Sequence, residues 1–323
     1  MISRTCRCVV SVAALLAALV VSSALATVEE TEAPPAGETP FPIRIRMLVT
    51  TGWLAEHLHD PNLVVLCIAE SRNFCRGGHI PGARFIPLEE IAVTRNGISH
   101  ELPDASVLKK VFERAGVANT SRIILYSERY GQLAARAYFT LDYLGLGDHA
   151  ALLDGGLEKW KAERREISVD IPRVTPTTLQ ITLNPAVVVG TAEMRKFSDV
   201  RASHSLALLD ARPADEYSGK GLSKDVTRAG HIPSATNVYW MDNLVSAENP
   251  VLKPPTELSA IYRWAGIGYG ARVVTYCRTG MQSSFDYFVA KYLGYDVRMY
   301  DSSFYEWSRK NLPAEKSAVA AGK

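Results

Sequence analysis

The sequence predicts an α/β protein of two similar domains, each a parallel sheet covered by helices on both faces. Short apolar runs rich in β-branched residues alternate with stretches of helical period, which is the pattern of such sheets. The same motifs recur in order at an offset of roughly 150 residues. With 323 residues, 47% hydrophobic and 22% charged, the chain is long enough for two domains and has an ordinary globular composition.

The repeat is visible in five matched pairs of segments, which keep the same order in both halves. The pairs are Leu63–Leu66 with Leu206–Leu209, Gly78–Pro81 with Gly230–Pro233, Arg122–Tyr126 with Arg272–Tyr276, Tyr143–Gly145 with Tyr292–Gly294, and Trp160 with Trp307. An ordered set of matches over this length indicates an internal duplication. We expect Trp160 and Trp307 to be core residues of the last helix of each domain.

The amino-terminal segment, residues 1–26, has the layout of a secretory signal. Two arginines precede an apolar run of about 13 residues, and small residues ending at Ala26 mark the expected cleavage site. The run is shorter than the roughly 20 residues that span a bilayer, so a retained membrane anchor is the weaker alternative. The sequence therefore predicts a periplasmic or secreted protein that leaves the membrane after cleavage.

The rest of the chain divides by composition. Residues 27–42 are acidic and Pro-rich and are predicted to be a disordered tether. The first domain is predicted over 43–165 and the second over 186–313, joined by an extended connector at 166–185 that is rich in Pro and Thr. Residues 314–323 are predicted to be a disordered tail.

The second domain shows the alternation of strand and helix most clearly. Leu258, Ile261, Tyr262 and Ala265 fall at helical spacing, which predicts a helix with Thr256 as N-cap and Gly266 as its stop. The elements predicted after this helix are a buried strand at Arg272–Tyr276, a helix at Gln282–Leu293, a strand near Val297–Tyr300 and a last helix before Pro313. In such sheets, ligands bind at the carboxyl ends of the strands.

Charge and cysteine content exclude several classes of partner. The formal net charge is only +2, and removal of the signal leaves as many basic as acidic residues, so nucleic acid is not an expected partner. No Cys/His set has zinc-ligand spacing, and no metal or cofactor is expected. Cys67, Cys75 and Cys277 follow the signal, so at least one thiol has no intramolecular partner. The sequence leaves open whether Cys67 and Cys75 form a disulfide.

Cys277 lies in the loop between the predicted strand and helix of the second domain. The N–H groups of a tight, Gly-containing loop at a helix N-terminus converge on one point and carry partial positive charge. Such a loop stabilises a thiolate, and Arg278 adds a formal charge beside it. The sequence therefore predicts that Cys277 is a reactive nucleophile rather than an inert buried thiol.

At these residues the sequence resembles the tandem-domain rhodanese family of sulfurtransferases. The resemblance is carried by Asp210 and Arg212, the Gly-His-Ile-Pro segment of both halves, the Asp154-Gly155-Gly156 signature followed by Trp160, and the loop itself. It implies that Cys277 takes a sulfane sulfur from a donor, holds it as a persulfide and passes it to an acceptor such as cyanide or a thiol in a ping-pong cycle. The implied cradle for the persulfide consists of Arg278, Thr279, Gly280, Met281 and Gln282.

The first half departs from the family pattern at its centre. Ser127 stands where the second half has Cys277, and Glu128 follows it with a charge that would oppose an anionic adduct. Cys67 matches Asp210. The resemblance implies a catalytically silent first domain that forms part of the wall of the second domain's site. We therefore expect one active site per chain, in a monomer.

Three other readings of the loop compete with thiosulfate transfer. A phosphatase of related architecture would need Arg six residues after the nucleophile, where this chain has Ser283. Mercaptopyruvate sulfurtransferases usually have Gly after the Cys, so Arg278 favours thiosulfate as donor, although thiosulfate-using loops often carry Lys where Thr279 stands. 3-Mercaptopyruvate remains the alternative donor. From another class, a non-catalytic exported sulfur carrier or anion-binding module also remains open.

Other charged residues of the two halves carry separate expectations. Asp210 and Arg212 are expected to form an ion pair at a strand end, with Arg212 also a candidate for substrate binding. Glu216 falls near the position where some relatives carry a substrate-binding Arg, and Arg228 is a candidate to replace that cation. The histidines that open the Ile-Pro turns, His79 and His231, are expected to be structural.

Overall fold

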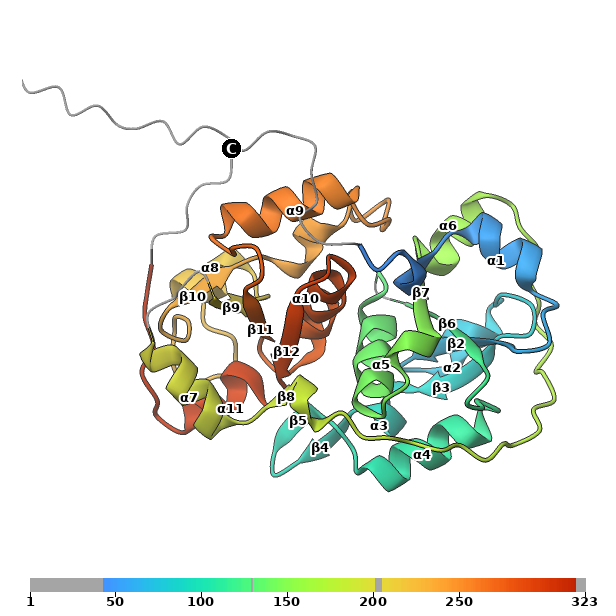
Figure 1. Ribbon diagram of the computed structural model, residues 1–323, viewed down its shortest axis with the longest axis horizontal. Helices are drawn as coiled ribbons and strands as arrows, with labels where there is room; N and C mark the ends of the chain where they lie inside the picture. Colours follow the sequence, from blue (N-terminus) through green and yellow to red (C-terminus); the bar gives the residue numbers. More distant parts are fainter. Residues whose placement is uncertain (1–42, 129, 201–204, 318–323) are drawn as a thin grey trace, which may run out of the picture. The chain divides into compact units, whose positions relative to one another are not determined.

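The two halves of the described chain each form a five-stranded parallel sheet (Figure 1). This computed structural model describes residues 43–128, 130–200 and 205–317. The first sheet contains, in spatial order, β1 (Leu48–Val49), β7 (Ala150–Leu153), β6 (Arg122–Ser127), β2 (Leu63–Ala69) and β3 (Arg84–Pro87). The second contains β8 (Val188–Val189), β12 (Asp296–Tyr300), β11 (Arg272–Tyr276), β9 (Leu206–Asp210) and β10 (Ala235–Asn237).

Corresponding strands occupy the same place in the two sheets. In the first, Leu63 pairs with Arg122 and Cys67 with Tyr126, and in the second, Leu206 pairs with Arg272 and Asp210 with Tyr276. The sheets are therefore copies of one unit, as the sequence repeat predicts. The predicted fold class, two α/β domains with parallel sheets, is confirmed.

Helices lie on both faces of each sheet. Those of the first half are α1 (Thr51–His57), α2 (Arg72–Arg76), α3 (Leu88–Ile91), α4 (Ala105–Arg114), α5 (Gln132–Tyr143) and α6 (Gly156–Ala162). Those of the second half are α7 (Thr191–Asp199), α8 (Ala214–Ser218), α9 (Pro255–Trp264), α10 (Met281–Tyr292) and α11 (Ser303–Arg309). Short 3-10 turns occur at η1 (Ile45–Met47), η2 (Gly147–His149), η3 (Pro185–Val187) and η4 (Trp240–Asn243).

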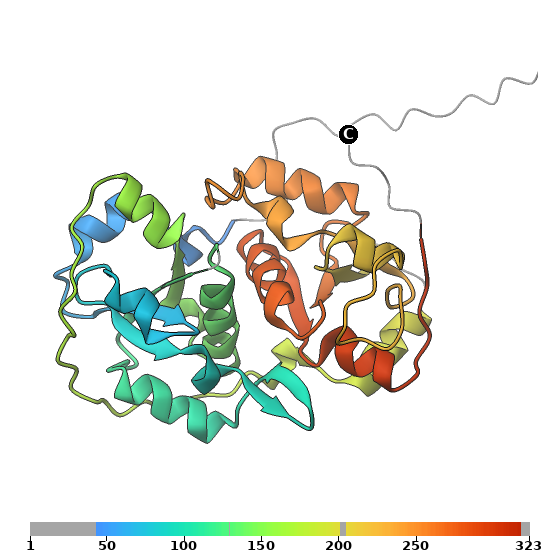
Figure 2. The same cartoon turned by 180° about the vertical axis from the view of Figure 1, so that it is seen from behind.

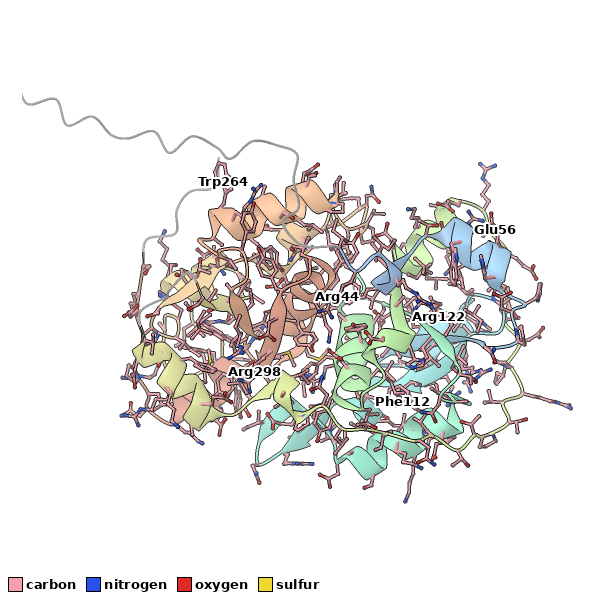
Figure 3. All side chains as sticks on the ribbon, viewed as in Figure 1. Arg44, Glu56, Phe112, Arg122, Trp264 and Arg298 are labelled. Carbon is pink, nitrogen blue, oxygen red and sulfur yellow. A yellow bond between two sulfur atoms is a disulfide. The ribbon has the colours of Figure 1, made fainter. Side chains whose placement is uncertain are left out.

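The covering helices turn apolar residues inward, with a few aromatic exceptions at the surface. Phe112 of α4 is fully buried in the core, whereas Trp264, the last residue of α9, is exposed (Figure 3). Single apolar side chains at the surface are common in folded proteins, so Trp264 alone does not indicate a binding site.

One apolar core is continuous between the two sheets, and α5 and α10 lie side by side within it (Figures 1 and 2). Phe139 meets Tyr287 edge-on with ring centroids 5.1 Å apart, and Tyr138 meets Phe288 in the same way at 5.0 Å. Edge-to-face pairs of this kind add about 0.5–1.5 kcal/mol each to the burial of their area. The outer face of each sheet has its own apolar cluster. The facing sides of the two domains are therefore packed as one interior.

The predicted elements of the second domain agree with the structure except for small differences at helix starts. Strand β11 has the predicted bounds, α10 begins one residue earlier than predicted, and α11 ends before Pro313. The prediction of Thr256 as an N-cap is wrong, because Pro254 occupies that position and Pro255 is the first helical residue. The fixed φ of Pro255 suits the first position of a helix and sets the start upstream of Thr256.

The Trp predictions are confirmed, and the question of the disulfide has an answer. Trp160 and Trp307 are buried, on α6 and α11. Cys67 and Cys75 form a disulfide, with their Cα atoms 6.7 Å apart. Among the described residues, Cys277 is the free cysteine.

Some predictions lie outside the described residues. The signal at 1–26 and the tether at 27–42 are among them, as are residues 318–323 of the tail predicted at 314–323. Residues 314–317 are described, and Glu315 forms an isolated bridge with His231. Within the described ranges, no helix combines the length and apolar character needed to cross a membrane. Between 166 and 184 the chain has no helix or strand apart from an isolated bridge that pairs Ser168 with His79.

Candidate active site

Cys277 follows the last residue of β11, at the carboxyl end of the central strand of the second sheet. Its side chain is buried, with 1% of the residue exposed. Its backbone N–H donates to Ser303 Oγ at 3.2 Å, and its carbonyl accepts from the N–H of Phe304 at 3.0 Å. The carbonyl of Arg278 accepts from the N–H of Tyr305 at 2.9 Å. The beginning of α11 therefore holds the backbone of the nucleophile on one side.

The loop from Cys277 leads directly into α10. Gly280 has φ +86°, a left-handed conformation that places the following residue at the start of the helix. The backbone N–H groups from Arg278 to Gln282 make no hydrogen bond within the described part of the chain. Unpaired N–H groups at a helix N-terminus form a concave site for negative charge. These groups are available to a thiolate, a persulfide or an anionic donor at Cys277.

Arg278 is held by groups of its own domain. Its Nη1 donates to Ser223 Oγ at 2.8 Å, and its guanidinium lies 3.6 Å from an Asp225 oxygen and 3.9 Å from a Glu216 oxygen. The side chain is about one-third exposed. Part of the charge of Arg278 is therefore offset by two carboxylates, which the sequence analysis did not anticipate.

A cavity of about 360 Å³ opens beside Cys277. The second domain contributes the loop residues Cys277, Arg278, Thr279, Met281 and Gln282, together with Asp225 and Tyr305. The first domain contributes Glu70, Leu88, Ser99, His100, Gln132 and Leu133. The buried Oε1 of Gln282 has no hydrogen-bond partner in the described residues. Nearly half of the cavity wall therefore comes from the domain that lacks the cysteine.

The first domain contacts the Cys277 loop through a hairpin formed by β4 (Val93–Arg95) and β5 (Ile98–Glu101). Asn96 and Gly97 both have positive φ, at 53° and 76°, as a tight two-residue turn requires. At the end of β5, His100 Nδ1 lies 3.0 Å from Thr279 Oγ1. The Asn-Gly pair is a sequence signal for a hairpin, but nothing local in the sequence indicates that this hairpin reaches the loop of the other domain.

A buried ion pair between the domains lies directly under Gly280. Arg136 of α5, fully buried, donates from Nη1 to Asp301 Oδ1 at 2.5 Å and from Nη2 to Oδ2 at 3.3 Å. Asp301 Oδ2 also accepts from the N–H of Leu102 at 2.8 Å. A Cβ added to Gly280 would lie 2.8 Å from Asp301 Oδ1, 2.9 Å from the Asp301 carbonyl and 3.1 Å from Arg136 Nη1. The loop therefore rests on the domain interface with no room for a side chain at 280.

In the equivalent loop of the first domain, Ser127 and Glu128 form hydrogen bonds with backbone groups of the protein. Ser127 is buried, and its hydroxyl donates to the Glu128 carbonyl at 2.8 Å and accepts from the N–H of Ala134 at 3.0 Å. The Glu128 carboxylate accepts from the N–H of Glu70 at 2.8 Å. In this domain, a hydroxyl and a carboxylate of the protein itself bind backbone N–H groups around the loop.

Of the predicted substrate-binding residues, Gly280 and two arginines do not line the cavity. Arg212 is buried, forms a bidentate ion pair with Asp210 and donates to the Gly230 carbonyl at 2.8 Å. Burial would lower the pKa of Arg212, but the Asp210 carboxylate outweighs it and raises the pKa. Arg228 donates to the Leu312 carbonyl at 2.5 Å. The predicted Asp210–Arg212 ion pair is present, whereas the assignment of Arg212 and Arg228 to the substrate site is not supported, because neither lines the cavity.

The two turn histidines are bound to backbone, as expected of structural residues. His79 Nδ1 lies 2.9 Å from the Ile80 carbonyl, and His231 Nδ1 lies 2.8 Å from the Tyr217 carbonyl. Because a carbonyl can only accept, both rings carry a proton on Nδ1. Among the described residues, no group of three or more His, Cys, Asp or Glu side chains is placed to hold a metal ion.

The fold and the cysteine loop define a sulfur-transfer class, and comparison with known proteins identifies the family. The model of the Rhodanese-like domain matches twice, at residues 50–163 and 193–310. The chain therefore belongs to the rhodanese family. With one such domain in each half, it is a tandem-domain sulfurtransferase.

Relatives cover most of the chain. The sulfur carrier protein TtuD of Thermus thermophilus is 34% identical over 281 residues, which cover 81% of this chain and 93% of that protein. A protein of Saccharopolyspora erythraea named "Putative thiosulfate sulfurtransferase" is 32% identical over 283 residues, covering 84% and 97%. Among solved structures, wild-type EanB is 23% identical with a TM-score of 0.74, covering 87% of this chain and 73% of that one. At that identity, the structural likeness shows the fold alone.

Proposed function

We propose that this protein transfers the sulfane sulfur of thiosulfate to a thiophilic acceptor, cyanide or a small thiol, through a persulfide on Cys277. One observation carries the proposal: the free thiol of Cys277 adjoins five consecutive backbone N–H groups that have no partner in the described chain. The relatives named for thiosulfate support the choice of donor. One site per chain follows, because Ser127 cannot take the role of a thiolate.

Both half-reactions balance without any further reagent. The Cys277 thiolate attacks the outer sulfur of thiosulfate, the sulfur–sulfur bond of the donor breaks, and sulfite leaves with the electron pair. Cyanide then attacks the outer sulfur of the persulfide, thiocyanate leaves, and the electron pair returns to the Cys277 sulfur. The loop N–H groups stabilise the negative charge at each stage, since fixed dipoles need no reorganisation during the reaction.

We also propose that the protein is exported as a monomer to the periplasm or beyond the cell. The signal-like layout of residues 1–26 supports export. The Cys67–Cys75 disulfide adds support, because such bonds persist in oxidising compartments. Cell fractionation of the native host, with and without residues 1–26, tests the location, and light scattering of the purified chain tests the monomer.

The mass of the intact protein tests the reaction. After incubation with thiosulfate and removal of excess donor, the wild type is expected to gain the mass of one sulfur atom and to lose it on addition of cyanide, with one thiocyanate formed per chain. The Cys277→Ser variant is the matched control and should gain nothing. A wild type that gains no sulfur, or a Cys277→Ser variant that gains as much, would contradict the proposal.

A second candidate is a sulfur carrier that hands its persulfide to a protein partner. The identity of 34% with the sulfur carrier protein TtuD favours it. A carrier would gain sulfur from thiosulfate but would not turn over repeatedly with cyanide or small thiols. Steady-state thiocyanate formation over many turnovers per chain therefore separates the two functions.

A further inference from the structure

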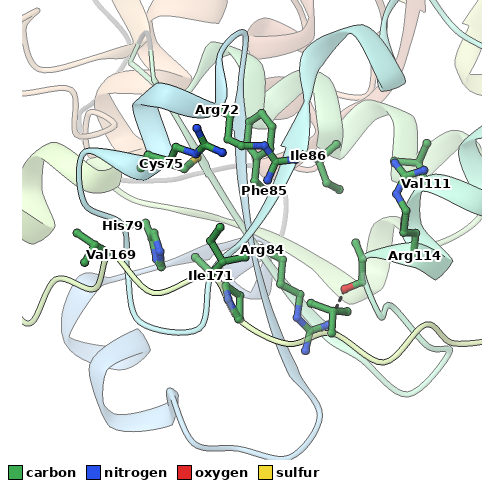
Figure 4. A pocket seen from close by; sticks show the side chains of 15 residues that line it. Arg72, Cys75, His79, Arg84, Phe85, Ile86, Val111, Arg114, Val169 and Ile171 are labelled. Atoms are coloured by element: carbon green, nitrogen blue, oxygen red, sulfur yellow. Dashed lines mark hydrogen bonds between the residues drawn. The ribbon is translucent and has the colours of Figure 1, made fainter.

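A second cavity lies in the first domain, and its wall shares no residue with the cavity at Cys277. Its volume is about 160 Å³, and it lies between α2, β3, α4 and the connector that follows α6 (Figure 4). The lining residues are Arg72, Cys75, Arg76, His79, Ala83, Arg84, Phe85, Ile86, Val111, Arg114, Ala115, Val169, Ile171, Pro172 and Val174. Four arginines line this cavity, and no aspartate or glutamate does.

Three of these arginines lack a carboxylate partner within the described residues. Arg72 and Arg76 form no ion pair there, and Arg72 lies over the Phe85 ring with its guanidinium carbon 4.6 Å from the centroid. Arg84 donates from Nη1 to the carbonyls of Ala115 at 2.6 Å and Gly116 at 3.1 Å. Its burial lowers the pKa of the guanidinium, since no opposite charge compensates the desolvation. The fourth, Arg114, forms an ion pair with Glu90.

The remaining wall is apolar and partly open. Val169 and Ile171 of the connector are 69% and 68% exposed, although both line the cavity. Phe85, Ile86 and Val111 line it from the domain itself, as Figure 4 shows. Exposed aliphatic side chains beside a hollow leave apolar surface in contact with water. A ligand that fits must therefore bury an apolar body as well as meet the guanidinium groups.

His79 adds a polar group at the connector side. Its Nδ1 donates to the Ile80 carbonyl, so Nε2 is the ring atom that remains for a ligand, and it makes no hydrogen bond within the described chain. The backbone of His79 exchanges two hydrogen bonds of 2.9 Å with Ser168, which fixes the connector against the domain. One wall of the cavity is thus held in place by the residue that also presents a polar atom to it.

We propose that this cavity binds a small organic anion, a carboxylate or sulfonate carried on a compact aromatic or branched aliphatic body. The volume matches that of the roughly 150 Å³ apolar cavity that accepts benzene. The planar donors of Arg72 and Arg76 suit the planar or trigonal oxygens of such an acid group, and Arg84 adds a positive charge to the wall. The apolar side chains of the wall, among them Phe85 and Ile171, bury the apolar body of the ligand. This site is separate from sulfur transfer at Cys277.

Calorimetric titration of the full chain with benzoate tests the proposal, with benzyl alcohol as the neutral probe of similar size. Benzoate is expected to bind, and benzyl alcohol to bind at least about tenfold more weakly, since a charge-assisted contact contributes at least that factor. Arg72→Gln and Arg76→Gln, both exposed positions, should each weaken benzoate by about tenfold. Arg195→Gln, which removes the same charge from an exposed position of α7, is the matched control and should bind as the wild type does.

The apolar wall is tested separately. Ile171→Asp places a carboxylate on an exposed position of the wall and should abolish benzoate binding while leaving thiocyanate formation at Cys277 unchanged. Val107→Asp, at an exposed position of α4 outside the wall, should leave binding intact. Absence of benzoate binding, equal affinity for benzyl alcohol, displacement of benzoate by equimolar inorganic sulfate, or equal weakening by Arg195→Gln would each overturn the proposal.

Discussion

Gly280→Ala is expected to damage both stability and activity, and Gly266→Ala is its matched control. Both glycines have positive φ, +86° and +79°, and both belong to the second domain. A Cβ at 266 would meet nothing within 4 Å. A Cβ at 280 would lie 2.9 Å or less from the Asp301 carbonyl and carboxylate, and 3.1 Å from Arg136 Nη1. The two variants therefore share the conformational penalty and differ only in the clash.

The magnitudes follow from these two contributions. A left-handed conformation costs an L-residue roughly 1–2 kcal/mol, which is the whole effect expected for Gly266→Ala. At 280, one of the close atoms is a backbone carbonyl that no side-chain rotation removes. Overpacking adds about 1–3 kcal/mol, so Gly280→Ala should lower the free energy of unfolding by about 2–5 kcal/mol.

Activity should separate the variants more sharply than stability. The loop must move to accommodate a methyl group at position 280, and a displacement of about 1 Å near a reacting centre can lower the rate by about a hundredfold. Urea unfolding followed by circular dichroism gives the stability, and thiocyanate formation from thiosulfate and cyanide gives the rate. Equal destabilisation by both variants, or full activity of folded Gly280→Ala, would refute the reasoning.

The remaining expectations concern the nucleophile, the loop cation, the donor and a buried acid of α10. Cys277→Ser should abolish thiocyanate formation in a folded protein, whereas Ser127→Ala should leave its rate nearly unchanged; the opposite pattern would exchange the roles of the domains. Arg278→Ala should raise the KM for thiosulfate by about tenfold. This is the lower end of the range for a charge-assisted contact, because two carboxylates already lie near the Arg278 guanidinium. An unchanged KM would show that Arg278 is a solvated surface charge. Thiosulfate should exceed 3-mercaptopyruvate in kcat/KM by at least about tenfold, or roughly 1.4 kcal/mol. The carboxylate of mercaptopyruvate lies further from its sulfur than the charged oxygens of thiosulfate do, and the cavity wall carries the acidic groups Glu70 and Asp225. Initial rates of both donors with cyanide test this preference, and a preference for mercaptopyruvate would contradict it. Burial raises the pKa of Asp286 well above normal, so the folded state keeps a proton that the unfolded state releases, and stability falls as the pH rises from the unfolded pKa toward the folded one. Asp286→Asn should remove this fall in urea unfolding measured at a series of pH values above the ordinary Asp pKa, and an unaltered pH dependence would contradict it.

The parts of the fold that sequence could predict are those specified by short, local patterns. The β-branched run Arg272–Tyr276 predicts a strand with the correct bounds, and the loop after it lies between strand and helix as expected. Gly266 is a helix stop, also as predicted. Thr256 is predicted as a cap because its side chain suits that position, but two adjacent prolines fix the backbone upstream.

The parts of the site that sequence could not predict depend on contacts between distant segments. His100 and Thr279 are 179 positions apart, and Arg136 and Asp301 are 165 apart. No pattern within either segment encodes such a pairing. The sequence leaves the Cys67–Cys75 disulfide open for the same reason, since the spacing of eight residues allows it only if the strand end and the helix bring the Cα atoms into range.

Arg212 and Arg228 show why charge alone does not locate the substrate site. Both are cations of the catalytic half. Because Glu216 falls near the position where some relatives carry a substrate-binding Arg, Arg228 is the candidate to replace that cation. In the structure, the guanidinium of Arg212 is bound to Asp210, and that of Arg228 to a backbone carbonyl. The buried Arg212 thus stabilises the fold through its ion pair, and Arg228, which is half-buried, lies outside the wall of the cavity at Cys277.

The cavity at Cys277 and the second cavity, in the first domain, differ in how they can bind an anion. At Cys277 two carboxylates, Asp225 and Glu216, approach the single guanidinium of Arg278, so the side chains there carry no net positive charge and backbone N–H dipoles provide the attraction for an anion. Such dipoles are fixed before the reaction and hold a sulfur that gains and loses charge in each half-reaction. In the first domain, arginines without counterions among the described residues line the second cavity, while the Ser127 hydroxyl, at the position of Cys277, accepts from the N–H of Ala134. A site for transient charge on a reacting sulfur and a site for a stable organic anion require different groups, and on our two proposals the duplicated fold carries one in each domain.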